Sequence, residues 1–386
     1  MRNPAFFSNF VSLVRELYET NDLIPLHAPQ FKGREKEYVV QTLESTFVSS
    51  VGKFVDEFEK RLADYTGAGF AVATSSGTAA LHTALRLVDV QPGDEVITIP
   101  LTFIATCNAI RYCGAEPVFV DVEQQTLGLC PESLATFLEV HAQVRDDGLC
   151  WNRASGRIIR ACVPVHNLGH PARIRDIAEI CLQYNIHLIE DAAESLGSLG
   201  DGIHTGCIGQ TGILSFNGNK IITTGSGGAL ITDDEVLAQR AKHLTTTAKQ
   251  RHPWLFLHDE VGFNYRLPNI NAALGCGQLE QLNEYVDAKR VLALRYQEWF
   301  DTVADVEFIT EPPRARSNYW LNAILLGDRD IRDSFLQYTN DAGVMTRPMW
   351  TPMHTLQMYR NCQRGDLSIA EVIEARLVSI PSSVIR

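Results

Sequence analysis

Three short stretches of the sequence carry side chains that could do chemistry together. The first contains Lys220, in SFNGNKIITTGSGG, among small and apolar residues and just before three glycines in four positions. An apolar, glycine-lined site disfavours the charged form of a lysine and leaves its amine nucleophilic towards carbonyls. Because a lysine whose head extends into water is the commoner case, Lys220 does not identify a function by itself.

The second stretch, IEDAAES, ends an apolar run with Asp191, and Glu194 follows closely. A carboxylate held there could accept a hydrogen bond from a protonated ring nitrogen and keep that ring charged. Capping of the next helix is the simpler role for an aspartate at this position.

The third stretch, SSGTAAL, places Ser76, Gly77 and Thr78 at the start of a helical pattern. Free backbone N–H groups and the positive end of the helix dipole make such a turn a natural seat for a phosphate. Ser-Gly-Thr is more often only a helix cap. A phosphate seat, a carboxylate for a ring nitrogen and a buried amine are, however, the parts needed to hold pyridoxal phosphate and use it as an electron sink. That combination is much harder to obtain by chance than any one part.

The elements that must position these residues alternate along the chain. Seven short β-rich runs recur: FAVATSS, DEVITIP, EPVFVDV, IIRACVPVH, HLIEDA, GILSFN and GGALIT. Helical patterns lie between them, with crossover helices expected at 78–88, 105–113, 131–141 and 173–184. This alternation predicts a mostly parallel sheet with helices on both faces. The last two runs are too close for a crossover helix and should pair antiparallel around Lys220.

The pattern changes after about residue 245. A long irregular segment is followed by a helical stretch from Asn271 to about Phe300, and then by VEFIT, YWLNAILL and a helix-rich tail. We therefore predict a large domain over 25–245 and a smaller α+β domain over 246–386. A helix within 1–24 should pack on the body, because its apolar residues recur at helical spacing.

Composition excludes several classes of protein. The 386 residues carry a net charge of −12, so no basic surface for nucleic acid is expected. The nine cysteines form no CxxC pair, which favours reduced thiols and a cytoplasmic location. No apolar run reaches the roughly 20 residues needed to span a membrane.

Six motifs in a fixed order make the pattern more specific. They are SSGTAALHTAL, PLTFIATCNAI, VPVHNLGHPA, EDAAESLGS, SFNGNKIITTGSGGAL and GFNYRLPNINAALG. Together they resemble the sugar aminotransferases of the DegT/DnrJ/EryC1/StrS group, over roughly residues 25–360. The resemblance implies an α/β fold of the PLP-dependent transferase fold type I (aspartate aminotransferase-like), with a seven-stranded mostly parallel sheet and a smaller C-terminal domain.

The resemblance also implies roles for individual residues. Lys220 would form the Schiff base with pyridoxal phosphate and later move protons, and Asp191 would pair with the ring nitrogen. Phe103 would stack on the ring, while Glu194 would lie near the ring hydroxyl, where many relatives carry glutamine. The phosphate would be held by Ser76, Gly77, Thr78, Ser215 and, from a second subunit, Asn264.

For the substrate, the resemblance is closest to the branch that acts on UDP-linked 4-keto-6-deoxy-N-acetylhexosamines, as in the legionaminic acid and bacillosamine pathways. The stretches STFVSSVGKFVDEFE and TRPMWTPMH carry this similarity. His166 would either border the same pocket or pack as a structural histidine. The substrate-binding residues implied are Ser49, Ser50, Lys53, His166, Arg347, Trp350 and His354.

Three alternatives remain at the level of sequence. Related PLP-dependent sugar dehydratases carry histidine at the Schiff-base position, where this chain has Lys220. A metal site could use His166, His170 and Cys162, although Gly169 and Pro171 argue for a loop rather than a helix there. A protein of this fold that has lost catalysis and serves as a scaffold or regulator is the third.

We therefore predict a cytoplasmic homodimeric aminotransferase without a metal. It would move an amino group from L-glutamate to the C4 ketone of a nucleotide sugar, most simply UDP-linked, for surface-polysaccharide or lipopolysaccharide biosynthesis. A GDP- or dTDP-linked keto sugar, as in perosamine synthases, is the alternative substrate.

Overall fold

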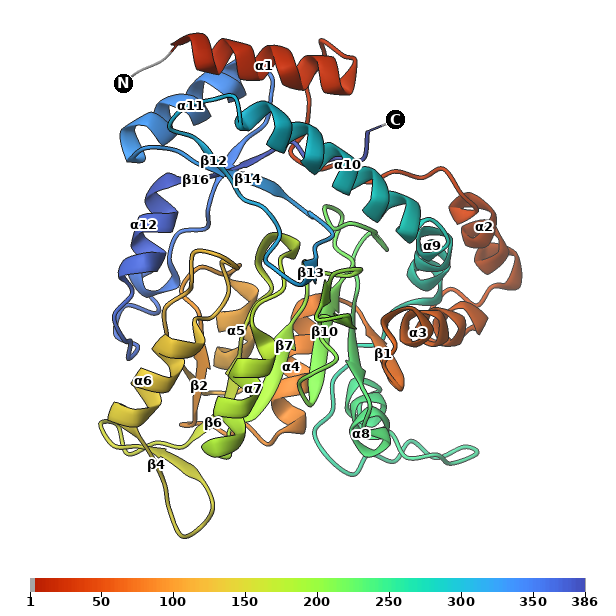
Figure 1. The fold of residues 1–386 in the computed structure, drawn as a ribbon. Coiled ribbons are helices and arrows are strands. Elements are labelled where there is room, and N and C mark those ends of the chain that lie inside the picture. The colour runs from red at the N-terminus through yellow and green to blue at the C-terminus, as the bar shows by residue number, and fades with distance from the viewer. Residues whose placement is uncertain (1–3, 386) are drawn as a thin grey trace.

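The computed structural model describes residues 4–385 and confirms the predicted sheet (Figure 1). Seven strands form one sheet in the order β1-β11-β10-β7-β6-β2-β3. From β10 to β3 all neighbours are parallel, whereas β11 is antiparallel to both β1 and β10, as expected for the strands around Lys220. The strands are β1 (Phe70–Thr74), β2 (Glu95–Thr98), β3 (Glu116–Phe119), β6 (Ile159–Val163), β7 (His187–Asp191), β10 (Thr211–Ser215) and β11 (Gly228–Thr232).

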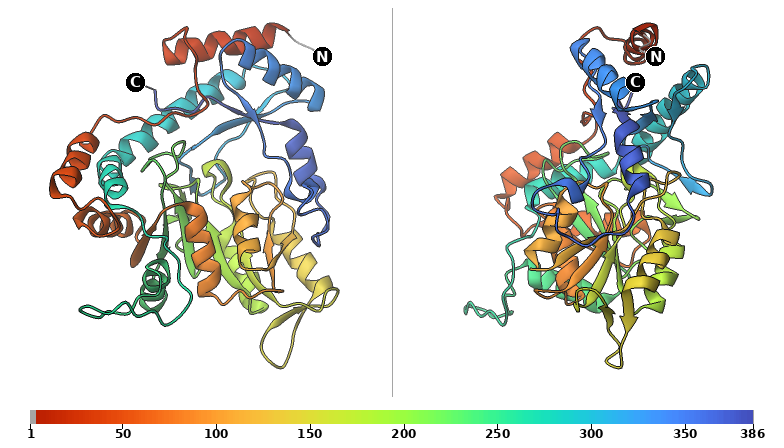
Figure 2. Two further views of the ribbon diagram at one scale, coloured as in Figure 1. Left: turned by 180° about the vertical axis from the view of Figure 1, so that it is seen from behind. Right: turned by 90° about the vertical axis from the view of Figure 1, so that its left-hand side faces the viewer.

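Helices cover both faces of this sheet (Figures 1 and 2). One face carries α4 (Gly77–Leu87), α5 (Ala105–Tyr112) and α8 (Glu235–Thr245), and the other carries α6 (Pro131–His141) and α7 (Ile174–Gln183). The four predicted crossover helices are therefore present, with ends shifted by one residue at most. Strands covered on both sides have few polar positions, and β2 and β11 are indeed buried along their whole length.

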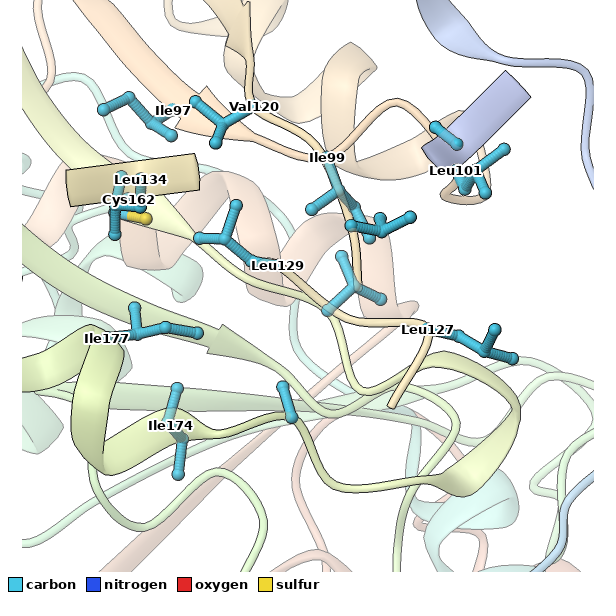
Figure 3. Packing of buried hydrophobic residues seen from close by; sticks show 14 of the residues in the cluster. Ile97, Ile99, Leu101, Val120, Leu127, Leu129, Leu134, Cys162, Ile174 and Ile177 are labelled. Atoms are coloured by element: carbon cyan, nitrogen blue, oxygen red, sulfur yellow. The ribbon is translucent and has the colours of Figure 1, made fainter. Parts of the chain in front are cut away.

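The core on the side of α6 and α7 shows how the pattern produces the layer (Figure 3). Ile97 of β2 and Cys162 of β6 project from the sheet, and Leu134 of α6 and Ile177 of α7 pack against the same layer. All four side chains are fully buried. Apolar side chains at a spacing of two in strands and three to four in helices necessarily meet in this way.

A second, smaller sheet lies at the other end of the chain. Its order is β12-β14-β16-β15, formed by β12 (Glu307–Phe308), β14 (Asn322–Leu325), β15 (Arg347–Pro348) and β16 (Leu377–Ile380). Around it lie α1 (Pro4–Tyr18), α10 (Leu282–Phe300), α11 (Arg329–Asp341) and α12 (Ser368–Arg376) (Figure 1). The rings of Phe6 and Phe10 on α1 contact Phe335 of α11 and Trp299 of α10. The domain limits at residues 24/25 and 245/246 stay a prediction.

The helical stretch expected from Asn271 to about Phe300 consists of two helices. The first, α9 (Asn269–Leu279), packs with α2 (Glu35–Ser45) and α3 (Lys53–Thr66), and α10 follows after Glu280 and Gln281. No helix within residues 4–385 is both long and apolar enough to cross a membrane. The remaining elements are short: β4 (Ala142–Val144), β5 (Cys150–Asn152), β8 (Leu199–Gly200), β9 (Ile203–His204), β13 (Ala315–Arg316), and the 3-10 turns Asn167–Gly169 and Met353–Thr355.

Lys289 of α10 is fully buried and donates hydrogen bonds to the carbonyls of Trp320 and Ser382. Burial lowers the pKa of this amine from 10.5 to about 7. Between these two values the unfolded chain holds the proton more tightly than the folded one, so the free energy of unfolding should rise with pH across that window. The slope expected for one proton is about 1.4 kcal/mol per pH unit.

Replacing Lys289 with methionine should flatten this rise, since the only change in charge is at that amine. Denaturant unfolding of both proteins at several pH values between neutral and alkaline would measure it. The substitution also leaves two carbonyls without their donor, so it should lower the stability overall. An unchanged pH slope in Lys289→Met, compared with the exposed Lys249→Met as control, would contradict the assignment.

Candidate active site

A cavity of about 380 Å³ opens where β7 and β10 end and α4 begins. Its volume lies within the usual range for small-molecule sites, roughly 300–1,000 Å³. Ligands of open α/β sheets bind at this edge of the sheet, at the carboxyl ends of the parallel strands. The lining brings together residues that are far apart in sequence: Ser76, Gly77, Thr78, Thr102, Phe103, Thr106, Asp191, Glu194, Ser215, Asn217, Asn219, Lys220, Trp320 and Trp350.

Lys220 enters this cavity from the turn that follows β10. Its backbone amide donates to the Asn217 carbonyl at 3.0 Å, which closes the turn. The side chain is only 12% exposed, and its Nζ lies 3.4 Å from Glu194 Oε1. The same Nζ lies 3.7 Å from the centre of the Trp320 ring. Lys220 is therefore a largely buried amine with two close neighbours rather than a surface lysine.

Asp191 ends β7 on the floor of the cavity, and its carboxylate is fixed on both oxygens. Oδ2 accepts from Thr106 Oγ1 at 2.8 Å, and Oδ1 accepts from the Ala193 amide at 3.1 Å. Burial raises the pKa of Asp191 above its usual range, although the Thr106 hydrogen bond and the Lys220 charge act in the opposite direction. A protonated ring nitrogen placed beside this carboxylate would supply a further favourable partner for its charged form.

The start of α4 forms the third wall. Ser76 caps the helix, with its Oγ accepting from the Ala79 amide at 3.1 Å and its carbonyl accepting from the Ala80 amide at 3.1 Å. The amides of Gly77 and Thr78 have no partner of this kind among residues 4–385, and both residues line the cavity. Free first-turn amides, the helix dipole and the nearby Ser215 hydroxyl together suit a phosphate.

Two glycines at this wall, Gly77 and Gly228, bear on whether a phosphate fits, because a side chain at either position would crowd the start of α4. A Cβ on Gly77 would lie 3.0 Å from Ser215 Cβ, and a Cβ on Gly228 would lie 2.5 Å from the Gly77 nitrogen. The absence of both side chains lets β11 and the start of α4 approach each other, and Gly225, with φ of +83°, turns the chain towards β11. The residues present therefore fit the phosphate of pyridoxal phosphate at the helix start and its ring between Asp191 and Lys220.

Substituting Gly228 with alanine should disturb this seat. The new Cβ would meet backbone atoms of Ser76 and Gly77 within 2.5 Å, so β11 or α4 must move. We expect a loss of about 1–3 kcal/mol of stability from overpacking and weaker binding of pyridoxal phosphate. Fluorescence titration with the cofactor measures the second effect. The matched change Gly218→Ala, where nothing lies within 4 Å of the new Cβ, should alter neither quantity.

Glu194 lines the same cavity as Asp191 and contacts the Lys220 amine. Its Oε2 accepts from the Leu168 amide at 2.9 Å, and its Oε1 faces Lys220. Burial raises the pKa of the Glu194 carboxyl, and the Lys220 charge partly offsets the rise. The donor that a carboxylate needs at this position is therefore provided by the lysine itself and by the backbone of Leu168.

The structure places His166 outside the cavity, which corrects the expectation that it borders the substrate. The side chain is fully buried, and its Nε2 lies 2.9 Å from Glu190 Oε2 while its Nδ1 accepts from the Ala172 amide at 3.0 Å. Both ring nitrogens are thus occupied by protein groups. The His166 amide donates to the Asp191 carbonyl at 3.1 Å, so this histidine packs behind the strand end as a structural residue.

His166 and His170 also do not come together as metal ligands. Within residues 4–385, the one group of side chains close enough to share an ion is His243, Asp259 and Glu260. Glu260 already forms a two-point ion pair with Arg240.

Several predicted substrate residues, and the predicted phosphate residue Asn264, lie elsewhere in this single chain. Ser49, Ser50, Lys53 and Asn264 do not line the cavity. Lys53 Nζ bonds Gln41 Oε1 at 2.9 Å, and Ser50 borders a separate wide depression with Lys249 and Arg251. His354 is nearly buried beside Glu371.

Arg347 and Trp350 lie closer to the site. Arg347 is exposed and lines a second cavity, of about 550 Å³, together with His27 and Trp350. This cavity shares Asn219, Trp320 and Trp350 with the one around Lys220. The two cavities therefore adjoin along one wall, and Trp350 borders both.

Sequence reasoning missed several residues that line or adjoin the site, among them Thr106, Trp320 and His27. Thr106 lies three positions after Phe103 in LTFIAT, near the start of the helix that follows a strand. That position could have indicated it. Trp320 and His27 come from segments 100 residues or more distant in sequence from Lys220 and carry no local signal.

Comparison with known proteins agrees with this geometry. The profile of the DegT/DnrJ/EryC1/StrS aminotransferase family matches residues 29–384. EpsN of Bacillus subtilis is 37% identical over 337 residues, covering 87% of this chain and 84% of EpsN. GDP-perosamine synthase of Escherichia coli O157:H7 is 35% identical over 361 residues, covering 93% of both chains.

Among solved structures, the aminotransferase TlmJ of Streptoalloteichus hindustanus superposes with a TM-score of 0.84 at 29% identity, covering 93% of both chains. The sheet order, the cavity at its edge and this likeness agree on an α/β transferase of fold type I.

Proposed function

Because the chain belongs to the DegT/DnrJ/EryC1/StrS aminotransferase family, whose members act on nucleotide-linked keto sugars with pyridoxal phosphate, we propose a specific reaction for it. The enzyme transfers the amino group of L-glutamate to the C4 ketone of a nucleotide-linked 4-keto-6-deoxy sugar. The first candidate substrate is a UDP-linked N-acetylhexosamine, and the product is a 4-amino sugar for glycan biosynthesis.

One observation carries the proposal. Lys220, Asp191 and the start of α4 line a single cavity of about 380 Å³. An amine, a carboxylate and a phosphate seat at one strand edge match the reactive carbon, ring nitrogen and phosphate of pyridoxal phosphate in both chemistry and arrangement.

Each residue has a distinct task in this reaction. When bound, pyridoxal phosphate supplies an electron sink for carbanionic chemistry and carries the amino group between the two substrates. Lys220 would bind the cofactor. Once free of it, Lys220 takes a proton from the α-carbon of the amino donor and, in the second half of the reaction, delivers a proton to C4 of the sugar. Asp191 holds the proton on the ring nitrogen, while the amides of Gly77 and Thr78 and the Ser215 hydroxyl hold the phosphate. Phe103, at the mouth of the cavity, covers the ring.

The adjoining cavity suits the nucleotide sugar. Its lining combines a cation, Arg347, with the apolar faces of Trp350 and Met349. A guanidinium can pair with a diphosphate, and an indole can cover the apolar face of a sugar. We propose Arg347 and Trp350 as substrate residues and place the sugar ring at the shared wall, with C4 towards Lys220.

A homodimer would bring the remaining predicted residues to the active site of the partner copy. Residues 246–262 extend from the body as an arm beyond α8 (Figure 2), and its side chains Trp254 and Phe256 are 76% and 80% exposed. Exposed apolar side chains gathered on one segment are typical of an interaction surface. We propose that the arm contacts a second copy, where Asn264 at its base reaches the phosphate and Ser49, Ser50 and Lys53 approach the sugar nucleotide. Sedimentation analysis showing a monomer with full activity would contradict this arrangement.

The second candidate substrate is a GDP-linked 4-keto-6-deoxy sugar. It is favoured by the 35% identity, over 93% of the chain, to a GDP-perosamine synthase. Incubating the enzyme with glutamate and UDP-, GDP- and dTDP-linked 4-keto-6-deoxy sugars, and measuring product mass and C4 stereochemistry, separates the candidates. The keto acid must leave before the sugar reacts, so double-reciprocal plots should be parallel. Intersecting plots, or no amination of any sugar in the panel, would overturn the proposal.

A further inference from the structure

Two side chains, Trp320 and Glu194, contact the Lys220 amine without any help from the cofactor, and we call this pair the amine seat. The Lys220 Nζ lies 3.7 Å from the centre of the Trp320 ring on one side and 3.4 Å from Glu194 Oε1 on the other. Trp320 is 3% exposed and Glu194 is 5% exposed, so water has little access to either neighbour. An ammonium over the face of a tryptophan is attracted by the ring quadrupole, and the attraction is strongest where water is excluded.

Trp320 is held in this position from three directions. Its indole Nε1 donates to the Asn219 carbonyl at 2.7 Å, and its backbone amide donates to Asn318 Oδ1 at 2.8 Å. Its carbonyl accepts from the buried amine of Lys289 at 3.1 Å. The ring is therefore not free to turn away from Lys220.

The same network joins the two sides of the seat. Asn318 Nδ2 donates to the Glu194 carbonyl at 3.0 Å, while Asn318 Oδ1 accepts from Trp320. One fully buried amide thus links the backbones of Glu194 and Trp320, the two residues whose side chains contact the Lys220 amine. If Trp320 only filled space, its position would not need to be fixed by these hydrogen bonds.

We propose that Trp320 is a positioning residue whose indole face, together with the Glu194 carboxylate, holds the detached Lys220 amine in place and stabilises the ammonium that forms when this amine takes up a proton. The inference rests on the proposed function of Lys220. In transamination the lysine is detached for part of every cycle, and it must then accept and return a proton without turning away. An aliphatic wall would disfavour the charge, whereas the indole face stabilises it and fixes its direction.

The first test uses the full-length protein loaded with pyridoxamine phosphate, the amine form of the cofactor, in which Lys220 is free. Acylation of each lysine by acetic anhydride is followed by peptide mass spectrometry, with the exposed Lys36 of α2 as internal reference. In Trp320→Leu we expect Lys220 to react about tenfold faster than in the wild type at neutral pH, because its charged form has lost the aromatic face. Trp320→Phe, which keeps a weaker face, should give an intermediate rate.

Access and charge can be told apart by repeating the labelling at alkaline pH, where most of the amine is uncharged. Faster labelling by a wider opening alone would persist there, whereas the effect of lost charge stabilisation should disappear. A difference that persists unchanged at alkaline pH, or equal labelling in Trp320→Leu and the wild type, would overturn the inference. Thermal melting of each variant checks that it is folded.

The second test measures a single turnover of amine transfer from the amino donor. Trp320→Leu should slow this step about tenfold, and Trp320→Phe should recover part of the loss. Trp151→Leu, which alters an indole far from the cavity, should change neither labelling nor turnover. Equal single-turnover rates in wild type and Trp320→Leu would contradict a positioning role.

The two proposals fail in different ways. If labelling follows the expected order but no sugar of the panel is aminated, the reaction assigned above is wrong and the seat stands. If sugars are aminated while labelling of Lys220 is the same in all variants, the reaction stands and the seat is wrong.

Discussion

Replacing Lys220 with alanine is expected to lower the rate of amine transfer by at least about 1,000-fold. The variant loses both the amine that binds the cofactor and the base that moves the proton, and no other lysine within residues 4–385 lines the cavity. Rates measured with glutamate and the sugar accepted by the wild type would show the loss. Absorbance of the purified protein should also show that the cofactor is no longer covalently attached.

The matched control is Lys36→Ala, which removes an exposed lysine of α2 outside the cavity and outside the proposed dimer arm and should leave the rate unchanged. Lys220→Ala takes away the charge that faces Glu194, so its melting temperature should be measured alongside. Turnover of a folded Lys220→Ala protein at the wild-type rate would refute the assignment of this residue.

Replacing Asp191 with asparagine is the second large effect, a loss of roughly 100- to 1,000-fold, as found when a single preorganised polar group is removed from an active site. An amide of the same shape can still accept from the Ala193 amide through its oxygen, while its NH2 group can donate to the Thr106 hydroxyl, so the fold should persist. It carries no charge, however, and cannot hold a proton on the ring nitrogen of the cofactor. The measurement is kcat with saturating substrates, together with the affinity for the cofactor.

Asp176→Asn is a suitable control, because it removes a carboxylate from the exposed side of α7. If Asp191→Asn kept more than about a third of the wild-type kcat, the proposed role of Asp191 would be wrong. A loss confined to cofactor affinity, with kcat restored at high cofactor concentration, would likewise limit Asp191 to binding.

Much of the fold could be predicted because it depends on local patterns. The seven β-rich runs and four crossover helices appear as expected, since apolar residues at spacings of two or of three to four specify one buried face each. The antiparallel pairing of β10 and β11 was also predictable, because the connection between them, which contains Lys220, is too short for a crossover helix. The break between α9 and α10 at Glu280 and Gln281 was missed, because no proline or run of polar residues marks it.

The candidate site could be predicted in part for a related reason. Asp191, Ser215 and Lys220 end strands or follow them, and strand ends of a parallel sheet meet at one edge. Trp320 could not be assigned from sequence, since its role arises from contacts with residues remote along the chain, such as Lys220 and Asn219. For His166 the sequence left a pocket role and a structural role open; the fully buried ring, with Nε2 2.9 Å from Glu190 Oε2, favours the structural one.

The sequence by itself determined the layers of this protein and the chemical parts of its site, because periodicity and residue type act locally. Only the tertiary structure decided how those parts face one another. The pairing of Lys220 with Glu194 and the indole of Trp320 joins segments that are far apart along the chain, through side-chain packing and one buried amide, Asn318. Such contacts depend on how segments from the large and the small sheet pack against each other, and no local pattern of residues encodes that packing.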